Sequence, residues 1–238
     1  MSSDQSNYYL ERRAKMLRGY DRFASRALPV MVERYGDAFA REVLADARVE
    51  FDAILPELPY IGGRANYFTP VIVVNGWAIA LFRAMRRRDK DAREVIRICA
   101  AVADGLFASI PTPLARLVGR AGFSWVIKSA FRRQAARSEK RQFSEDFVYR
   151  FKEGGTDDWE LEFSECAVNK LYDAQDVREL KPFCNFFDVT YSRHLGMGID
   201  AHQTIGLGCD TCRLRYKHGR TTEIPAALDG LLPNEIKR

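Results

Sequence analysis

The spacing of apolar residues changes once along this chain of 238 residues, at Phe143. Before that point, apolar side chains recur every three or four residues, the period of a helix that buries one face. After it, they alternate with polar ones, as in Trp159, Leu161 and Phe163, which single glutamates separate. A period of two is that of a strand with one buried face. Helices followed by strands predict an α+β fold, in which an N-terminal helical half packs on a C-terminal antiparallel sheet.

Proline and glycine divide the first 140 residues or so into predicted helices. The first helix is expected to start at Leu28, because Pro29 then stands in its first turn, where proline is suited, and to end before Pro56. The second is apolar almost all round and is therefore expected at the centre of the protein. The predicted helices cover residues 28–55, 67–85, 92–107 and 114–137.

The second half is predicted to hold two pairs of strands with helices inserted between them. The run Glu-Gly-Gly-Thr-Asp-Asp at 153–158 is turn chemistry between two alternating segments, which indicates a hairpin. Two further strands are expected at 199–205 and 212–217. Between the pairs, we expect a short helical piece at 167–172 and a longer helix at 182–195, ended by Gly196.

This pattern divides the chain into three parts. Residues 1–142 are the helical half, residues 143–219 are the α+β half that carries the candidate site, and residues 220–238 form a weakly structured tail. We expect the two halves to form one integrated domain.

Composition narrows the classes of protein to consider. A chain that is 47% hydrophobic and 29% charged is typical of a globular protein. Charged residues interrupt the apolar ones over 8–20, so no export signal is evident and a cytoplasmic location is expected. The longest uncharged run, residues 65–82, contains two asparagines and a proline, which favours a buried helix over a membrane span.

The net charge of +5 raises the question of nucleic-acid binding. Basic residues gather at 83–90 and 128–141, but neither stretch has the interleaved aromatic residues of a single-strand binder or a groove-reading motif. Solvated helix faces are the better interpretation, and no nucleic acid is expected as a partner. The expected partner is a small molecule, and a homo-oligomer is left open.

Four of the five cysteines lie in the second half of the chain. An odd number of cysteines without an export signal argues against disulfides. On the helix predicted to start near Pro182, Cys184, Asp188 and Tyr191 recur at spacings of four and three, which places them on one face. The cysteines are Cys99, Cys166, Cys184, Cys209 and Cys212.

Three interpretations of these cysteines stay open. Most free cysteines are small buried hydrophobes, and Cys99 on its apolar helix fits that description. A thiolate nucleophile would use Asp188 or a histidine as its base, and His202 is the histidine chosen because its predicted strand closely precedes Cys212. A zinc site would use Cys209 and Cys212, whose two-residue gap suits a knuckle, with Cys166 or Cys184 completing it.

Several segments in order resemble a known family. They are 163–166 (Phe-Ser-Glu-Cys), 180–184 (Leu-Lys-Pro-Phe-Cys) followed by Asp188, and 212–216 (Cys-Arg-Leu-Arg-Tyr) after Gly206 and Gly208. Together they resemble the C-terminal signature of the L-2-amino-thiazoline-4-carboxylic acid hydrolase family. Upstream, 58–63 (Leu-Pro-Tyr-Ile-Gly-Gly) with Asn66 resembles the helical half of that family.

The resemblance implies a hydrolase that opens a small cyclic amidine or thiazoline-type carboxylic acid. The catalytic candidates that it suggests are Cys184, the first thiol to test, then Cys166, with Cys212 beside them and Asp188 as base or orienting group. No cofactor is expected, and zinc is left open.

Four further residues are candidates for binding the substrate. Tyr191 lies on the face of Asp188, and His202 precedes Cys212. Arg213 or Arg215 could hold the substrate carboxylate, because a guanidinium matches a carboxylate with two hydrogen bonds.

The chain is also similar, more faintly, to the small-molecule-binding 4-vinyl reductase domains. In those domains, cysteines and an acid hold zinc beside a ligand pocket, although Thr204 here stands where one such cysteine would fall. This likeness implies the alternative function, a binding or sensory module, zinc-containing or not, without turnover.

Overall fold

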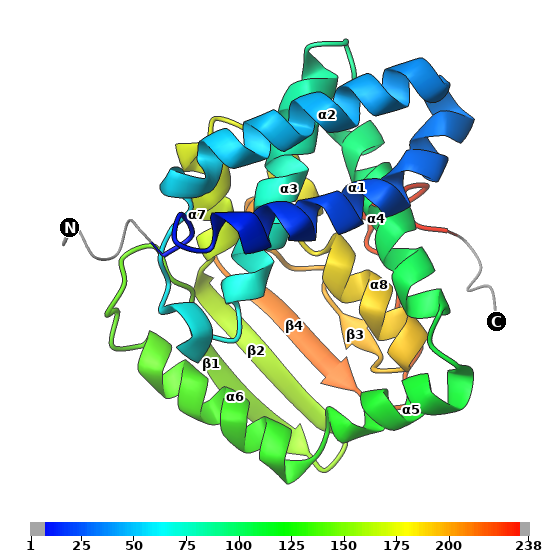
Figure 1. Cartoon of the computed structure of the whole chain (residues 1–238). Coiled ribbons are helices and arrows are strands. Elements are labelled where there is room, and N and C mark those ends of the chain that lie inside the picture. The colour runs from blue at the N-terminus through cyan, green and yellow to red at the C-terminus, as the bar shows by residue number, and fades with distance from the viewer. Residues whose placement is uncertain (1–7, 234–238) are drawn as a thin grey trace.

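The computed structural model describes residues 8–233. Its helices come mostly first and its sheet last, so the predicted α+β fold is confirmed (Figure 1). The α-helices of the described chain are α1 (Arg13–Tyr35), α2 (Asp37–Ile54), α3 (Thr69–Arg86), α4 (Ala92–Ala108), α5 (Thr112–Ala121), α6 (Trp125–Ser138), α7 (Ala167–Ala174) and α8 (Phe186–Leu195). Short 3-10 helices are η1 (Leu55–Glu57), η2 (Gly63–Ala65), η3 (Arg178–Phe183), η4 (Ile205–Leu207) and η5 (Ala226–Leu228).

Four strands form one antiparallel sheet within the described residues. In space they follow the order β1, β2, β4, β3, and β1 and β2 are the predicted hairpin. The helices α7 and α8 are inserted between β2 and β3. The strands are β1 (Val148–Gly155), β2 (Asp158–Glu165), β3 (Ile199–Asp200) and β4 (Cys212–Lys217).

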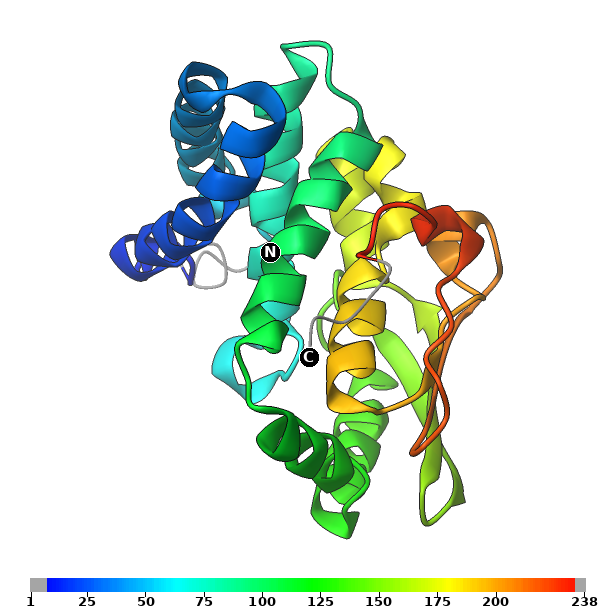
Figure 2. The ribbon, with the colours of Figure 1, turned by 90° about the vertical axis from the view of Figure 1, so that its right-hand side faces the viewer.

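Helices cover one face of the sheet and leave the other open (Figures 1 and 2). The apolar helix α3 is central, as predicted: it packs against α2, α4 and α7, and side chains such as Ile72, Ile79 and Leu81 are fully buried. A helix that is apolar all round needs neighbours on every side, and this position supplies them.

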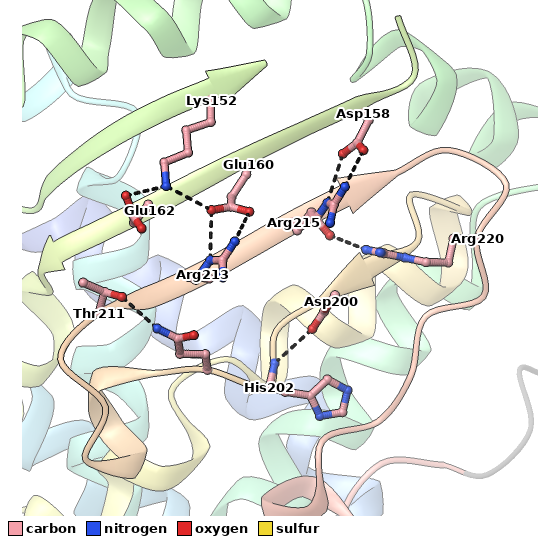
Figure 3. Close-up of polar contacts among 11 residues, drawn as sticks. Lys152, Asp158, Glu160, Glu162, Asp200, His202, Thr211, Arg213, Arg215 and Arg220 are labelled. Atoms are coloured by element: carbon pink, nitrogen blue, oxygen red, sulfur yellow. Dashed lines mark hydrogen bonds and ion pairs between the residues drawn. The ribbon is translucent and has the colours of Figure 1, made fainter. Parts of the chain in front are cut away.

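The alternation along β2 and β4 gives the sheet two different faces. Trp159 on β2 lies opposite Tyr216 on β4, and their stacked rings are 4.1 Å apart between centroids on the buried face. The side chains that alternate with these rings along β2 and β4 point to the other face of the sheet. There, Arg213 donates two hydrogen bonds of 3.0 Å to the Glu160 carboxylate (Figure 3). Arg215 pairs similarly with Asp158 on that open face.

Two predicted helix boundaries in the first half are wrong. The predicted helix 28–55 is in fact two helices, because α1 continues through Pro29 and the chain turns at Gly36, whose φ of +85° suits glycine. The predicted helix 114–137 is likewise divided into α5 and α6. Ser124 begins α6, since its hydroxyl accepts a hydrogen bond of 3.4 Å from the backbone N–H of Ile127.

Two further predictions in the second half are only partly right. The α-helix expected at 182–195 begins at Phe186, because the residues before it form the 3-10 helix η3. Cys184 therefore precedes the helix that carries Asp188. The strand expected at 199–205 ends at Asp200, because the chain then leaves the sheet edge and turns through η4.

The tail predicted to be weakly structured is packed on the core as far as the structure describes it. Leu228, Leu231 and Leu232 are at most 4% exposed, and the Thr222 hydroxyl lies 3.0 Å from that of Ser192. Three leucines in a segment of this length bury enough apolar surface to hold it in place. Residues 234–238 of the predicted tail lie outside the described residues.

The basic stretch at 83–90 is paired with acids of α2. Arg87 contacts Glu50 at 2.6 Å and Arg88 contacts Asp46 at 2.8 Å. Its charge is thus largely compensated within the protein. Over residues 8–233, no single helix is long and apolar enough to cross a membrane, although α4 and α5 together, bent by 102°, meet the length and composition criteria.

The contact between α5 and α8 gives a test of the fold. Gly119 on α5 lies so close to α8 that an added Cβ would overlap the carbonyl oxygen of Leu195. We expect Gly119→Ala to lower the free energy of unfolding by about 1–3 kcal/mol, the usual cost of overpacking.

Gly105→Ala on α4 is the matched control, because nothing lies within 4 Å of its Cβ position. Alanine favours the helix, so this variant should be unchanged or more stable by about 0.5–1 kcal/mol. Urea denaturation followed by circular dichroism measures both. Equal stability of the two variants would contradict the close packing of α5 on α8.

Candidate functional site

One cavity brings together residues from distant parts of the second half. It has a volume of about 80 Å³ and lies between the buried face of the sheet and the inserted helices. Its lining includes Cys166, Cys184, Asp188 and Cys212, the four catalytic candidates from the sequence. Apolar side chains, Phe163 among them, form much of the rest of the wall.

Each of the four side chains reaches the cavity from a different segment. Cys166 is the N-cap of α7, directly after β2. Cys184 follows η3, and Asp188 lies in the first turn of α8. Cys212 opens β4 and points to the buried face, because it alternates with Arg213.

The Cys166 thiol is the acidic one of this group. A hydrogen bond from the Cys212 side chain is the largest of the influences that lower the pKa of Cys166 to about 6. The backbone N–H groups of Val168 and Asn169, at the start of α7, lower this pKa further. Together, these hydrogen bonds outweigh burial, which raises the pKa. A thiolate at a helix N-terminus is stabilised by these donors and by the helix dipole. Cys166 is therefore mostly ionised at neutral pH.

The other two thiols stay protonated. The pKa of Cys212 is raised chiefly because its proton is shared with the Cys166 sulfur, and burial raises it further. The Cys212 sulfur also accepts a hydrogen bond of 3.1 Å from the backbone N–H of Ile205. Burial, then the nearby Cys166 and Asp188, raise the pKa of Cys184. The cavity thus holds one thiolate and two neutral thiols.

Asp188 is poised to carry a proton near neutral pH. Burial is the main cause that raises the pKa of its carboxyl to about 7, and the Cys166 thiolate raises it further. The hydroxyl of Tyr191 hydrogen-bonds to the carboxylate and partly offsets this shift. Tyr191 in turn hydrogen-bonds to the hydroxyl of Tyr216. A carboxyl with a pKa close to the working pH can both donate and accept a proton.

Unpartnered polar atoms surround the same cavity. The Oδ1 atom of Asn185 and the Oγ1 atom of Thr204, both lining residues, make no hydrogen bond with a described residue. The buried amide of Asn169 lies close enough to Cys166 and Cys184 to influence their pKa, yet none of its atoms has a hydrogen bond of ordinary geometry. Buried polar groups without partners are rare in proteins. Here they are groups that a bound molecule could satisfy.

The sequence interpretation did not single out these three residues as polar members of the site. Asn169 could have been predicted from the sequence. Cys166 precedes a predicted helix as its N-cap, and Asn169, three residues later, is at position N3, whose backbone N–H points towards the N-cap side chain. Asn185 directly follows Cys184. For Thr204 the sequence signal was its place where the 4-vinyl reductase domains have a cysteine, and the path of the chain after β3 brings it to the cavity.

Three predicted binding residues lie elsewhere. Arg213 and Arg215 are on the open face of the sheet, opposite the cavity, and are paired with carboxylates of β2 (Figure 3). His202 is exposed in the loop after β3, where its Nε2 lies 3.5 Å from Glu223. None of the three lines the cysteine cavity. The alternation along β4 already implied that Arg213 and Arg215 face away from Cys212.

The remaining cysteines are also separate from the cavity. Cys99 is buried on α4, where burial raises the pKa of its thiol to about 12, so it is a small hydrophobe as interpreted from the sequence. Cys209 is half-buried in the loop before β4 and does not line the cavity.

The cysteines and Asp188 are not arranged as a metal site. Within residues 8–233, no three side chains of His, Cys, Asp or Glu are placed to hold a metal ion together. The suggested knuckle of Cys209 and Cys212, completed by Cys166 or Cys184, is not formed.

The fold and the cavity define an α+β protein with a partly buried thiol–carboxyl site. No protein-family model, no curated protein and no solved structure matches this chain.

The ionisation of Cys166 gives a test of the site. We expect the rate of its alkylation by iodoacetamide to rise through a midpoint near pH 6, because the thiolate is the form that reacts. Peptide mass spectrometry after timed quenching at pH 4.5 to 9 measures each cysteine separately.

Cys209, which is half-buried outside the cavity, serves as the internal control. Its alkylation in the same samples gives the reference rate for a cysteine outside the cavity. If the alkylation rate of Cys166 did not rise through a midpoint near pH 6, the proposed thiolate at the start of α7 would be wrong.

Proposed function

We propose that this protein is a cysteine-dependent hydrolase that opens a small cyclic amidine of the thiazoline type. One observation carries the proposal: Cys166, Cys184, Cys212 and Asp188, from four separate segments, line a single small cavity. A thiolate and a carboxyl with a pKa near neutrality are the nucleophile and the proton carrier that such a hydrolysis requires.

The charge of the cavity favours the amidine end of such a substrate. The described residues that line it include no Lys, Arg or His, while Cys166 brings a negative charge. A protonated amidine is a cation, so it complements this lining. A ring carboxylate would have no cation to pair with among these residues and would therefore point out of the cavity. This orientation replaces the pairing with Arg213 or Arg215 expected from the sequence.

The first step uses Cys166 as nucleophile. Its sulfur forms a bond to the ring carbon between sulfur and nitrogen, and the C=N electron pair moves onto nitrogen. The ring C–S bond then breaks as the C=N bond re-forms, and the departing sulfur takes the proton of Asp188. The enzyme now holds the opened substrate through a bond from Cys166 to the former ring carbon.

The second step returns the enzyme to its starting state. Water adds to the same carbon and gives one proton to the Asp188 carboxylate. The Cys166–carbon bond breaks, the thiolate leaves, and the remaining hydroxyl proton passes to solvent as the C=O bond forms. The net reaction adds one water and yields a carbamoyl-substituted amino thiol. Cys212 contributes by holding the thiolate between turnovers, because its S–H donates to Cys166.

The proposal predicts which substitutions remove activity. With 2-amino-thiazoline-4-carboxylate as substrate, Cys166→Ala should lower kcat/KM by at least about a thousandfold, because it removes the nucleophile, and Asp188→Asn by about a hundredfold or more. Mass spectrometry of the carbamoylated product measures the rate without a thiol reagent.

Arg213→Ala and His202→Ala are the controls, since both side chains lie outside the cavity. They should stay within about twofold of the wild type. Binding of the ring compound by wild type without any product would support the alternative, a binding module. Full activity in Cys166→Ala would overturn the mechanism.

The proposal also predicts how the activity depends on pH. Activity needs Cys166 ionised, so it should rise as the pH passes about 6, and it needs Asp188 protonated, so it should fall above about 7. The profile of kcat/KM should therefore be a narrow bell with its maximum between these values. Asp188→Asn, whose amide does not titrate, should lose the alkaline limb of whatever activity remains.

A further inference from the structure

A second and larger hollow, which we call the α1–α3 groove, lies between α1, the η2 loop and α3. Its volume is about 770 Å³, and it shares no lining residue with the cysteine cavity. Figure 1 shows α1 crossing α3 where the groove is formed. Small-molecule pockets have volumes of about 300–1,000 Å³, so the groove is large enough for an organic ligand.

The floor of the groove is apolar. Met16 of α1 and Val73, Val74 and Trp77 of α3 line it. Gly19 lets the two helices approach, because an added Cβ would lie 3.0 Å from a ring carbon of Trp77. A surface of this kind offers burial to an apolar body.

Two polar side chains of the floor, those of Thr69 and Asn66, already have partners within the protein, whereas the buried indole N–H of Trp77 has none among the described residues. The Thr69 hydroxyl donates to the carbonyl oxygen of Gly63 at 2.7 Å, and the Asn66 amide donates to that of Ile61 at 2.6 Å. These groups have little hydrogen-bonding capacity left for a ligand. The surface of the floor therefore consists mainly of the apolar side chains of Met16, Val73 and Val74 and the ring of Trp77, which suit an apolar body.

Four cations line the groove, and no acid of residues 8–233 pairs with them. Lys15, Arg18 and Arg22 follow each other on one face of α1 at spacings of three and four, and Arg64 stands on the η2 loop. No Asp or Glu is among the described lining residues, and none of these four cations makes an ion pair with another residue of the described chain. Such a cluster attracts an anion.

Nearby cations of α1 and α2 that do not line the groove are paired with acids. Arg13 of α1 pairs with Asp52, and Arg48 of α2 pairs with Asp21 at 2.7 Å. Acids are thus available in this part of the molecule, but they are placed away from the groove.

We propose that the α1–α3 groove binds an amphiphilic organic anion, whose apolar body lies on the floor while its carboxylate or phosphate meets the four cations. The groove is independent of the cysteine site, so this proposal does not depend on the hydrolase activity.

Laurate, dodecanol and dodecyltrimethylammonium test the proposal with one tail and three head groups. Binding to the full chain is measured by isothermal titration below the micelle concentration of each compound. We expect laurate to bind at least about tenfold more tightly than either of the others, because only its head group is an anion. Dodecyl phosphate should bind at least as well as laurate, which would extend the site to phosphate head groups, and weaker binding would restrict it to carboxylates.

Arg22→Glu and Arg26→Glu form a matched pair of variants. Both residues are exposed on α1 and lack an ion pair in the described chain, but only Arg22 lines the groove. Arg22→Glu should weaken laurate binding by about fivefold, the size expected for reversing one surface charge pair, and Arg26→Glu by less than twofold. The rate of Cys166 alkylation confirms that each variant is folded.

Three results would overturn the proposal. Equal binding of laurate and dodecanol would show that charge has no role. Equal effects of Arg22→Glu and Arg26→Glu would show only a general effect of net charge. Binding to phosphatidylglycerol vesicles without binding of monomeric laurate would assign this surface to a membrane instead.

Discussion

The strict alternation of side chains along β2 and β4 is the constraint on which the rest of the structure depends. It places Trp159 and Tyr216 on one face and the Glu160–Arg213 pair on the other. A face that exposes large aromatic rings must be covered, and helices α6, α7 and α8 pack around that face. The open face needs no cover, because its charges are paired with each other (Figure 3) and the side chains of Arg213 and Arg215 are about half exposed.

The cover over the buried face also determines the chemistry of the cavity. Burial disfavours every ionised group there, and it raises the pKa of both Cys184 and Asp188. Cys166 departs from this trend because it stands where β2 ends and α7 begins, so that backbone donors and the Cys212 thiol all point at its sulfur. The order of acidity among the three cavity thiols therefore follows from their surroundings, in which the Cys212 side chain has the largest effect on Cys166 and the backbone N–H groups of α7 add to it.

Much of the fold could be predicted from the sequence, because it depends on periods that extend over many residues. The change of period at Phe143, the β1–β2 hairpin and the central place of α3 were all predictable in this way. The wrong predictions concern helix boundaries that depend on a single residue. The turn at Gly36 and the start of α6 at Ser124 depend on a single φ angle and a single cap, and the period of the flanking residues does not report either of them.

By itself, the sequence determined which faces are buried and which reactive side chains the second half contains. It even placed Arg213 and Cys212 on opposite sides of β4. Only the tertiary structure decided that Cys166, Cys184, Asp188 and Cys212 meet and that Cys166 is the ionised thiol. It also decided that the cations of α1 face a groove in which none of the described lining residues is an acid. The physical reason is that distance and desolvation between segments far apart in the chain arise from packing, which no local pattern encodes.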